Sequence, residues 1–196
     1  MTPFTARLKR TLNFSFLERQ IFSFLLAFVG VVYELSFAQM LSATLGNTAL
    51  RYATTIGLFT LTLGLSSILY DRWKIALPYL QLSLVAVGAL GPLWIIVADP
   101  KNFPESFYSA MEVLSYVPII AAGFISGFEL PWLMDNVSGN RKSFILAWDY
   151  FGMFIGTLVF PLFLLPVWGV SNSLYFCALL NAVAFAYLLT KVGKTP

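Results

Sequence analysis

The chain has 196 residues, of which 59% are hydrophobic and only 11% are charged, and its mean hydropathy is +0.80. Soluble domains are about one quarter charged, so this composition excludes an ordinary soluble fold and indicates a protein of the lipid bilayer. The chain has no histidine and one cysteine, Cys177. An internal disulfide and the usual histidine- or thiolate-based sites are therefore excluded, and we expect no metal, no cofactor and no nucleic-acid partner.

Taken in chain order, residues 1–19 form a basic arm, in which Phe14, Phe16 and Leu17 would also suit a helix lying among lipid headgroups. Six apolar stretches follow, each close to the roughly 20 residues that a membrane-spanning helix needs. They are 20–43, 52–70, 75–97, 112–134, 143–167 and 172–190. The sequence predicts an all-α polytopic membrane protein, with a transmembrane domain of six helices over residues 20–190 and a short tail over 191–196.

Lysine and arginine are divided unevenly between the two sides of this predicted domain. The arm, the turns after the second and fourth spans, and the tail together hold ten of them, whereas the other side holds only Arg51 and Lys101. Because positive loops stay in the cytoplasm, this division predicts an integral protein of the cell (inner) membrane with both termini cytoplasmic.

Three acidic residues lie inside predicted spans: Glu34, Glu129 and Asp149. A charge inside the bilayer is costly, and such residues usually face the interior of the bundle and serve a function. No lysine or arginine lies deep in any span, so an ion pair between these three acids and a basic residue of the same chain is excluded. Three interpretations stay open, one of which is contact with a partner subunit; the other two concern the chain itself. The acids are neutral groups that hydrogen-bond between helices, or they bind protons or a cationic ligand, with Tyr33 and Tyr150 adding contacts between the cation and an aromatic ring.

Small residues at helical spacing predict where the helices pack, because they let two backbones approach closely. The glycines expected on these faces are Gly30, Gly57, Gly64, Gly152 and Gly156. Gly152 and Gly156 share one face with Asp149, which a neighbouring helix would therefore shelter.

Pro131 interrupts the fourth span two residues after Glu129. A proline inside a helix leaves the carbonyl four residues earlier without its donor, which here is the carbonyl of Gly127. A carboxylate beside a broken helix is typical of transporter binding sites.

Two short segments of the chain resemble each other. "YELSFAQMLSATLGN" (33–47) and "FELPWLMDNVSGN" (128–140) both begin with an aromatic residue and Glu-Leu, and both end in Gly-Asn. Each copy would hold three spans, so the copies would have opposite orientations in the membrane. The match suggests a 3+3 inverted repeat in which Glu34 and Glu129 are equivalent.

Four segments of the chain follow one known pattern. They are "YELSFAQMLSATLGNTALRYATTIGLFTLTLGLSS" (33–67), "GFELPWL" (127–133), "AWDYFGMFIGTLVFPLFLLPVWG" (147–169) and "NAVAFAYLL" (181–189). This pattern resembles the N-terminal membrane region of the membrane-embedded spermidine synthase-like proteins, which are aminopropyltransferase-type enzymes. The resemblance implies a six-span module with Glu34, Glu129, Asp149 and Tyr150 at the motif positions of the family. The association of that family with polyamines favours a cationic ligand.

Family members of the fused kind continue into a soluble α/β domain with a Gly-rich nucleotide-binding loop. This chain stops at Pro196 and contains no Gly-x-Gly-x-x-Gly motif. We therefore expect that the chain is not an enzyme and has no catalytic residue. An aspartyl-type pair of Glu129 and Asp149 is the remaining catalytic alternative, and the glycine-aspartate motifs of intramembrane proteases are absent.

Two functions fit these observations. The first is binding or transport of a small, polyamine-like cation by the intramembrane carboxylates. The second is a non-catalytic anchor or accessory subunit of a larger membrane complex. A homo-oligomer or a membrane complex suits either function.

Overall fold

The computed structural model describes residues 14–135 and 137–192, and these residues form helices and turns without any strand. The elements are α2 (Phe16–Leu45), α3 (Thr48–Trp73), α4 (Leu77–Val97), η1 (Pro100–Asn102), η2 (Glu105–Phe107), α5 (Tyr108–Leu114), α6 (Val117–Ser126), α7 (Glu129–Met134), α8 (Asn140–Val159), η3 (Phe160–Leu164) and α9 (Leu165–Val192). The expected all-α fold is confirmed.

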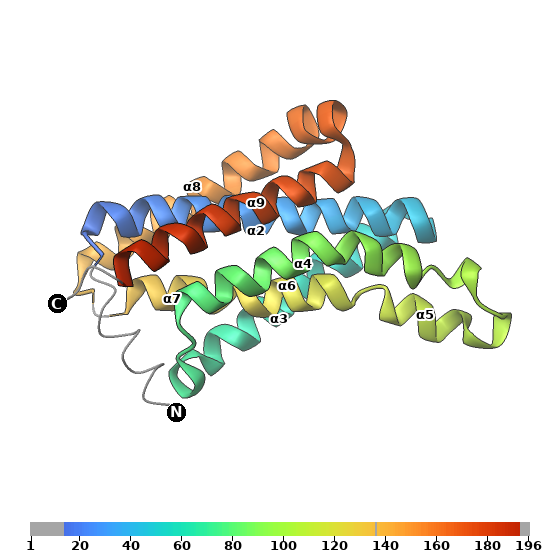
Figure 1. Cartoon of the computed structure of the whole chain (residues 1–196), viewed down its shortest axis with the longest axis horizontal. Coiled ribbons are helices and arrows are strands. Elements are labelled where there is room, and N and C mark those ends of the chain that lie inside the picture. Colours follow the sequence, from blue (N-terminus) through green and yellow to red (C-terminus); the bar gives the residue numbers. More distant parts are fainter. Residues whose placement is uncertain (1–13, 136, 193–196) are drawn as a thin grey trace.

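Five stretches of the described residues are long and apolar enough to cross a membrane. They are Phe16–Leu45, Thr48–Trp73, Leu77–Val97, Glu105–Met134 and Asn140–Lys191. The sequence predicted six, and the difference lies at the C-terminal end. The predicted fifth and sixth spans form one continuous stretch, which breaks at Gly169 (φ 76°) and folds back there (Figure 1).

The ends of the first two helices follow directly from local sequence. Ser15 and Glu18 form a capping box at the start of α2, in which each side chain accepts a hydrogen bond from the backbone N–H of the other. Gly46 (φ 74°) and Asn47 (φ 51°) make the turn into α3, and the side chain of Asn47 caps that helix. Left-handed backbone of this kind is most easily adopted by glycine and asparagine.

The basic arm enters the structure only at its end, because residues 1–13 lie outside the described part of the chain, as do residues 193–196 of the tail. Phe14, which would also have suited a helix among lipid headgroups, is buried against Phe22 and Trp132. The Arg19 guanidinium donates to the carbonyls of Leu133 and Asp135. The start of α2 is thereby held against the end of α7.

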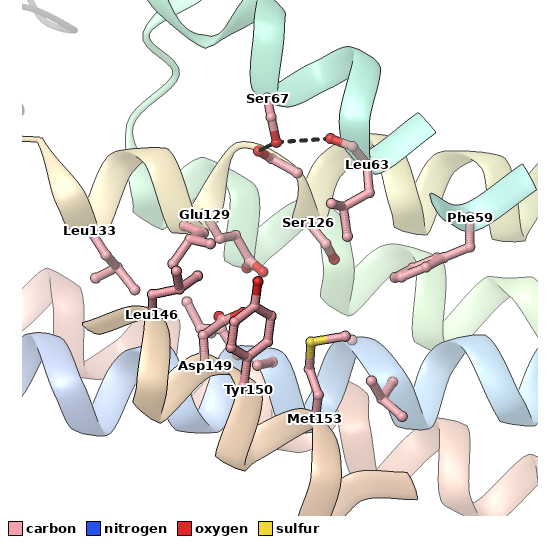
Figure 2. A pocket seen from close by; sticks show the side chains of 16 residues that line it. Phe59, Leu63, Ser67, Ser126, Glu129, Leu133, Leu146, Asp149, Tyr150 and Met153 are labelled. Carbon is pink, nitrogen blue, oxygen red and sulfur yellow. Dashed lines mark hydrogen bonds between the residues drawn. The ribbon is translucent and has the colours of Figure 1, made fainter. Parts of the chain in front are cut away.

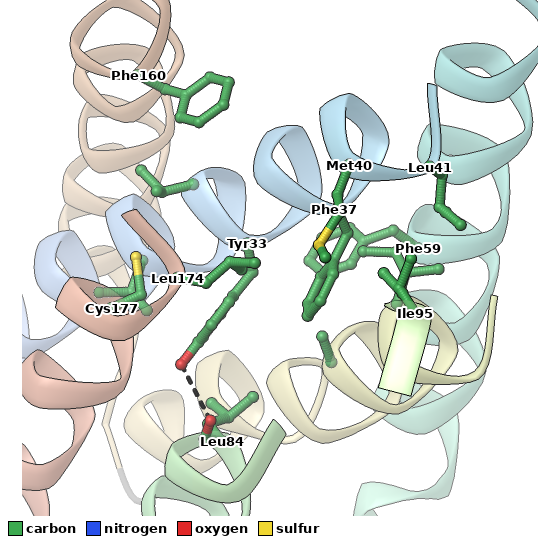
Figure 3. Close-up of a cluster of buried hydrophobic side chains, with 14 of the residues drawn as sticks. Tyr33, Phe37, Met40, Leu41, Phe59, Leu84, Ile95, Phe160, Leu174 and Cys177 are labelled. Atoms are coloured by element: carbon green, nitrogen blue, oxygen red, sulfur yellow. Dashed lines mark hydrogen bonds between the residues drawn. The ribbon is translucent and has the colours of Figure 1, made fainter. Parts of the chain in front are cut away.

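The helices form three rows. α2 and α6 lie in the middle row, α4 and α9 pack on one side of them, and α3 and α8 lie on the other side (Figures 1 and 2). The most extensive packing joins α2 with α8, α4 with α9, and α3 with α6. One apolar cluster fills the centre around Tyr33 and Phe37 of α2 (Figure 3), and a second lies around Phe128 and Trp132.

The contact between α8 and α2 depends on two of the predicted glycines. A Cβ added at Gly152 would overlap the carbonyl oxygen of Phe24, and one added at Gly156 would lie 2.9 Å from the carbonyl oxygen of Phe28. The two backbones therefore touch at successive turns of α8, as the spacing of these glycines predicted.

The contact between α3 and α6 is built in the same way. A Cβ at Gly123 would meet the backbone of Phe59, and one at Gly127 would meet the carbonyl of Leu63. Glycines four residues apart thus bring the backbone of α6 onto that of α3.

The predicted packing role of Gly57 and Gly64 is not found within the described chain. Both are exposed, and a Cβ at either position would have no other atom within 4 Å. The inner face of α3 consists of larger and β-branched residues instead: Thr55, Phe59, Thr62, Ser66 and Tyr70. The glycines at the contact between α3 and α6 belong to the α6 segment, so the face of α3 that carries Gly57 and Gly64 points outward. Gly30 takes a milder role, with the Phe59 ring 3.9 Å from its Cβ position.

We predict that Gly152→Ala lowers the free energy of unfolding by about 1–3 kcal/mol, because the added methyl group has to push α8 away from α2. Gly64→Ala is the matched control. It adds the same methyl group to an open helical surface and is expected to leave stability unchanged or raise it by up to about 1 kcal/mol. Equal stability of the two variants in a detergent unfolding titration would contradict the close contact.

Candidate functional site

A cavity of about 250 Å³ lies between α2, α3, α8 and the junction of α6 with α7 (Figure 2). Most of its wall is apolar, and no lysine or arginine of the described residues lines it. The polar side chains on its wall are Ser67, Ser126, Glu129, Asp149 and Tyr150. Three of the residues predicted from sequence as ligand-binding are therefore brought together here, from the consecutive helices α7 and α8.

Glu129 is the most enclosed acid of this site, with 4% of its surface exposed. It is the first residue of α7 and points from the middle row toward the cavity. The Nε2 atom of Gln81, on α4, donates a hydrogen bond of 2.5 Å to its Oε1 atom. A buried carboxyl group needs such a donor, because an unpaired polar atom in an apolar interior is costly.

Asp149 reaches the cavity from the opposite side, on the face of α8 that packs on α2. The Ser23 hydroxyl lies 3.3 Å from its Oδ1 atom and 3.0 Å from the carbonyl oxygen of Ile145, so it can donate to either. Asp149 is half-buried, and the expectation that a neighbouring helix shelters it is confirmed. The acid is tolerated in an apolar helix because the glycine face on which it lies is turned inward.

Two hydroxyl groups complete the polar part of the wall. The Ser126 hydroxyl is buried and has no hydrogen-bond partner among the described residues. Tyr150 lies at the rim with 61% of its surface exposed, and its hydroxyl points toward Glu129 (Figure 2). The Ser126 oxygen is thus available as an acceptor for a bound group.

Pro131 has the effect expected of it. The helix is interrupted between α6 and α7, and the Ser67 hydroxyl of α3 lies 2.8 Å from the Gly127 carbonyl oxygen and 2.9 Å from that of Leu63, so it can donate to either. A donor from α3 is thus in place for the acceptor that the proline leaves free. This contact fixes the wall of the cavity beside Glu129.

Two of the predicted ligand-binding residues do not line the cavity. Tyr33 is fully buried, and its hydroxyl donates to the carbonyl of Leu84 (3.0 Å) and accepts from Nδ2 of Asn181 (3.1 Å) (Figure 3). Glu34 is half-buried and lies one helical turn beyond Gly30, which does line the cavity. The ligand-binding roles of Tyr33 and Glu34 stay predictions.

Sequence reasoning missed the two partners of the acids, Gln81 and Ser23. Gln81 is the only strongly polar side chain of the stretch 77–97, and it is fully buried. A single amide in an otherwise apolar span was the available signal. Nothing in the spacing, however, indicated which acid it would face.

We predict that Gln81→Leu destabilises the protein by about 1–3 kcal/mol, because the Glu129 carboxyl group then loses its donor. The double variant Gln81→Leu/Glu129→Leu should lose less stability than the sum of the two single variants, since neither polar group is then left alone. Thermal unfolding of the four proteins in one detergent measures this coupling. Strictly additive losses would mean that the two side chains do not interact.

Comparison with known proteins gives relatives of one kind. Polyamine aminopropyltransferase 1 of Streptomyces coelicolor is 31% identical over 172 residues, which cover 82% of this chain and 31% of the relative. Polyamine aminopropyltransferase 2 of Aquifex aeolicus is 28% identical over 181 residues (87% of this chain, 35% of the relative). The polyamine aminopropyltransferase of Leptospira interrogans is 25% identical over 159 residues (78% and 31%). The homologues of this chain are therefore polyamine aminopropyltransferases, and the chain spans about a third of their length.

No family model matches the sequence, and no solved structure is significantly similar to it. The expectation that the chain is not an enzyme is wrong, because relatives from several species are named as enzymes and point to an enzyme family. That expectation rested on the missing nucleotide-binding motif within residues 1–196. The relatives extend well beyond the part that these residues match.

Proposed function

We propose that this chain is a membrane module of a polyamine aminopropyltransferase-type protein and that its cavity binds a small, polyamine-like cation. The observation that carries the proposal is the meeting of Glu129 and Asp149 on opposite walls of one cavity. The names of the relatives support the choice of ligand class.

The electrostatics of the cavity favour a cation. Within the part of the chain that the structure describes, the hydrogen-bond donors to the two carboxyl groups are the neutral side chains of Gln81 and Ser23, and no positive side chain lines the wall. A bound ammonium group supplies the opposite charge that the chain does not provide, in surroundings where a charge pair is weakly screened. Tyr150 at the rim adds an aromatic surface for such a cation.

The proposal places the module in the inner membrane with six spans and both termini in the cytoplasm. The turn at Gly169 supports six spans, because it divides the last apolar stretch into two arms, each long enough to cross. In this arrangement Glu129 and Asp149 lie in the cytoplasmic half of the bilayer. A homo-oligomer or a larger membrane complex stays a prediction.

The packing pattern supports a 3+3 inverted repeat. If the first three spans match the last three, the α2–α8 contact is equivalent to the α3–α6 contact, and these are two of the three most extensive contacts. The third of these contacts joins α4 and α9, which the repeat would exchange with each other, so the repeat leaves this contact unchanged. When Gly46–Asn47 is aligned in sequence with Gly139–Asn140, Phe59 and Leu63 of α3 align with Gly152 and Gly156 of α8. The first two residues are where α3 touches α6, and the last two are where α8 touches α2.

We predict saturable spermidine binding to the purified protein in nanodiscs, weakened at least tenfold by Glu129→Gln and by Asp149→Asn. Glu105→Gln, outside the cavity on the loop side, is the matched control and should bind like the parent. Glu34→Gln tests whether the predicted role of that residue extends to this site. Absence of binding by a well-folded parent would overturn the cation site and leave an anchoring role for the module.

Cysteine labelling tests the topology, because the single native cysteine is buried and replaceable by Cys177→Ala. In that background we predict that a membrane-impermeant maleimide labels Asn102→Cys and Ser171→Cys on cells whose outer membrane has been opened. Ser138→Cys should react only after the inner membrane is permeabilised. Protection of Ser171→Cys together with Ser138→Cys would contradict six spans, since the Gly169 turn would then not reach the outer face.

A further inference from the structure

The cavity is open on one side. Both α3 and α8 pack on α2, but they share no extensive contact with each other, and side chains that line the cavity between them are exposed. Figure 2 is seen from this side, with α3 above the cavity and α8 below it. Tyr150 and Met153 lie at this opening and are 61% and 36% exposed.

The opening faces sideways. α3 and α8 run obliquely from one end of the molecule toward the other, and its long axis is the membrane normal in the proposed topology (Figure 1). Most of the partly exposed residues around the opening are apolar, with Leu63, Leu130 and Met153 among them. A molecule dissolved in the hydrocarbon layer therefore meets an apolar entrance.

In the proposed topology, Asp149 lies below the headgroup layer. Asp149 is nine residues after the start of α8, which places it roughly 13 Å along the helix axis at 1.5 Å per residue. A ligand reaching it from the side needs a charged end for the acids and an apolar part for the entrance and the lipid beyond.

The wall matches the three donors of a primary ammonium group. Glu129 and Asp149 offer carboxylate oxygens, and the third acceptor is the Ser126 hydroxyl, which is buried, faces the cavity and has no hydrogen-bond partner among the described residues. An unsatisfied buried hydroxyl is unusual in a folded protein, and a bound donor would satisfy it.

We propose that the cavity also binds the ammonium end of a membrane-dissolved alkylamine, which enters sideways between α3 and α8 and leaves its hydrocarbon chain in the lipid. This inference rests on the proposed cation site. It extends that site from water-soluble polyamines to amines that partition into the bilayer, and it assigns the route by which they arrive.

The test is binding of radiolabelled dodecylamine to the protein in nanodiscs, with empty nanodiscs subtracted. We expect saturable binding near one amine per chain, weakened at least tenfold in Glu129→Gln/Asp149→Asn. Met153→Trp, which narrows the entrance, should weaken it at least fivefold. Leu158→Trp adds the same ring to an exposed position of α8 outside the cavity and should bind within twofold of the parent.

Competing ligands separate the head from the chain. Dodecanol has the same chain without the charge, and butylamine has the same charge with a short chain, so an excess of either should displace dodecylamine poorly. Binding that does not saturate above empty nanodiscs, or that is unaffected by the acid and Met153 variants, would overturn the inference.

The same measurements distinguish this inference from the proposed function. Spermidine binding that depends on the acids, without dodecylamine binding, would overturn the lateral route and retain the cation site. Loss of both would overturn both. Dodecylamine that displaces spermidine, with both dependent on Glu129 and Asp149, would support a shared site.

Discussion

Direct contact between helix backbones, made at glycine, is the constraint on which the rest of this structure depends. α8 touches α2 at Gly152, and α6 touches α3 at Gly127. In a bilayer the lipid tails are as apolar as the side chains, so close packing rather than water exclusion holds such pairs together. Asp149 lies on the inner side of the first pair and Glu129 lies just beyond the second, at the start of α7, and the cavity is the space left between the two pairs.

The acids are the second element of this arrangement. Glu129 follows directly after the α6–α7 break, and Asp149 precedes Gly152 by one turn, so each carboxyl group is positioned by the same feature that brings its helix into contact. Their donors, Gln81 and Ser23, come from other helices and are neutral. The pair is thus hydrogen-bonded but not charge-matched, which is the chemical basis for proposing a cationic ligand.

Some features were predictable from local sequence because their causes are local. The interruption at Pro131, the turn at Gly46 and Asn47, and the inward face of Asp149 each follow from a residue type and its immediate neighbours. The stripe of Gly57 and Gly64 shows the limit of this reasoning. Small residues permit close packing, but the contact was made by the glycines of α6, and the stripe on α3 remained exposed.

The sequence by itself determined that the chain is helical and apolar enough for a membrane, and that its spans contain acids without internal cations. Composition and helical spacing are sufficient for these conclusions, because lipid requires every span to satisfy its own backbone. Only the tertiary structure decided that Glu129 and Asp149 share a cavity while Glu34 and Tyr33 lie outside its wall. It also decided that the cavity opens between α3 and α8. Both features depend on how helices pack in three dimensions, which the spacing of residues within one helix does not predict.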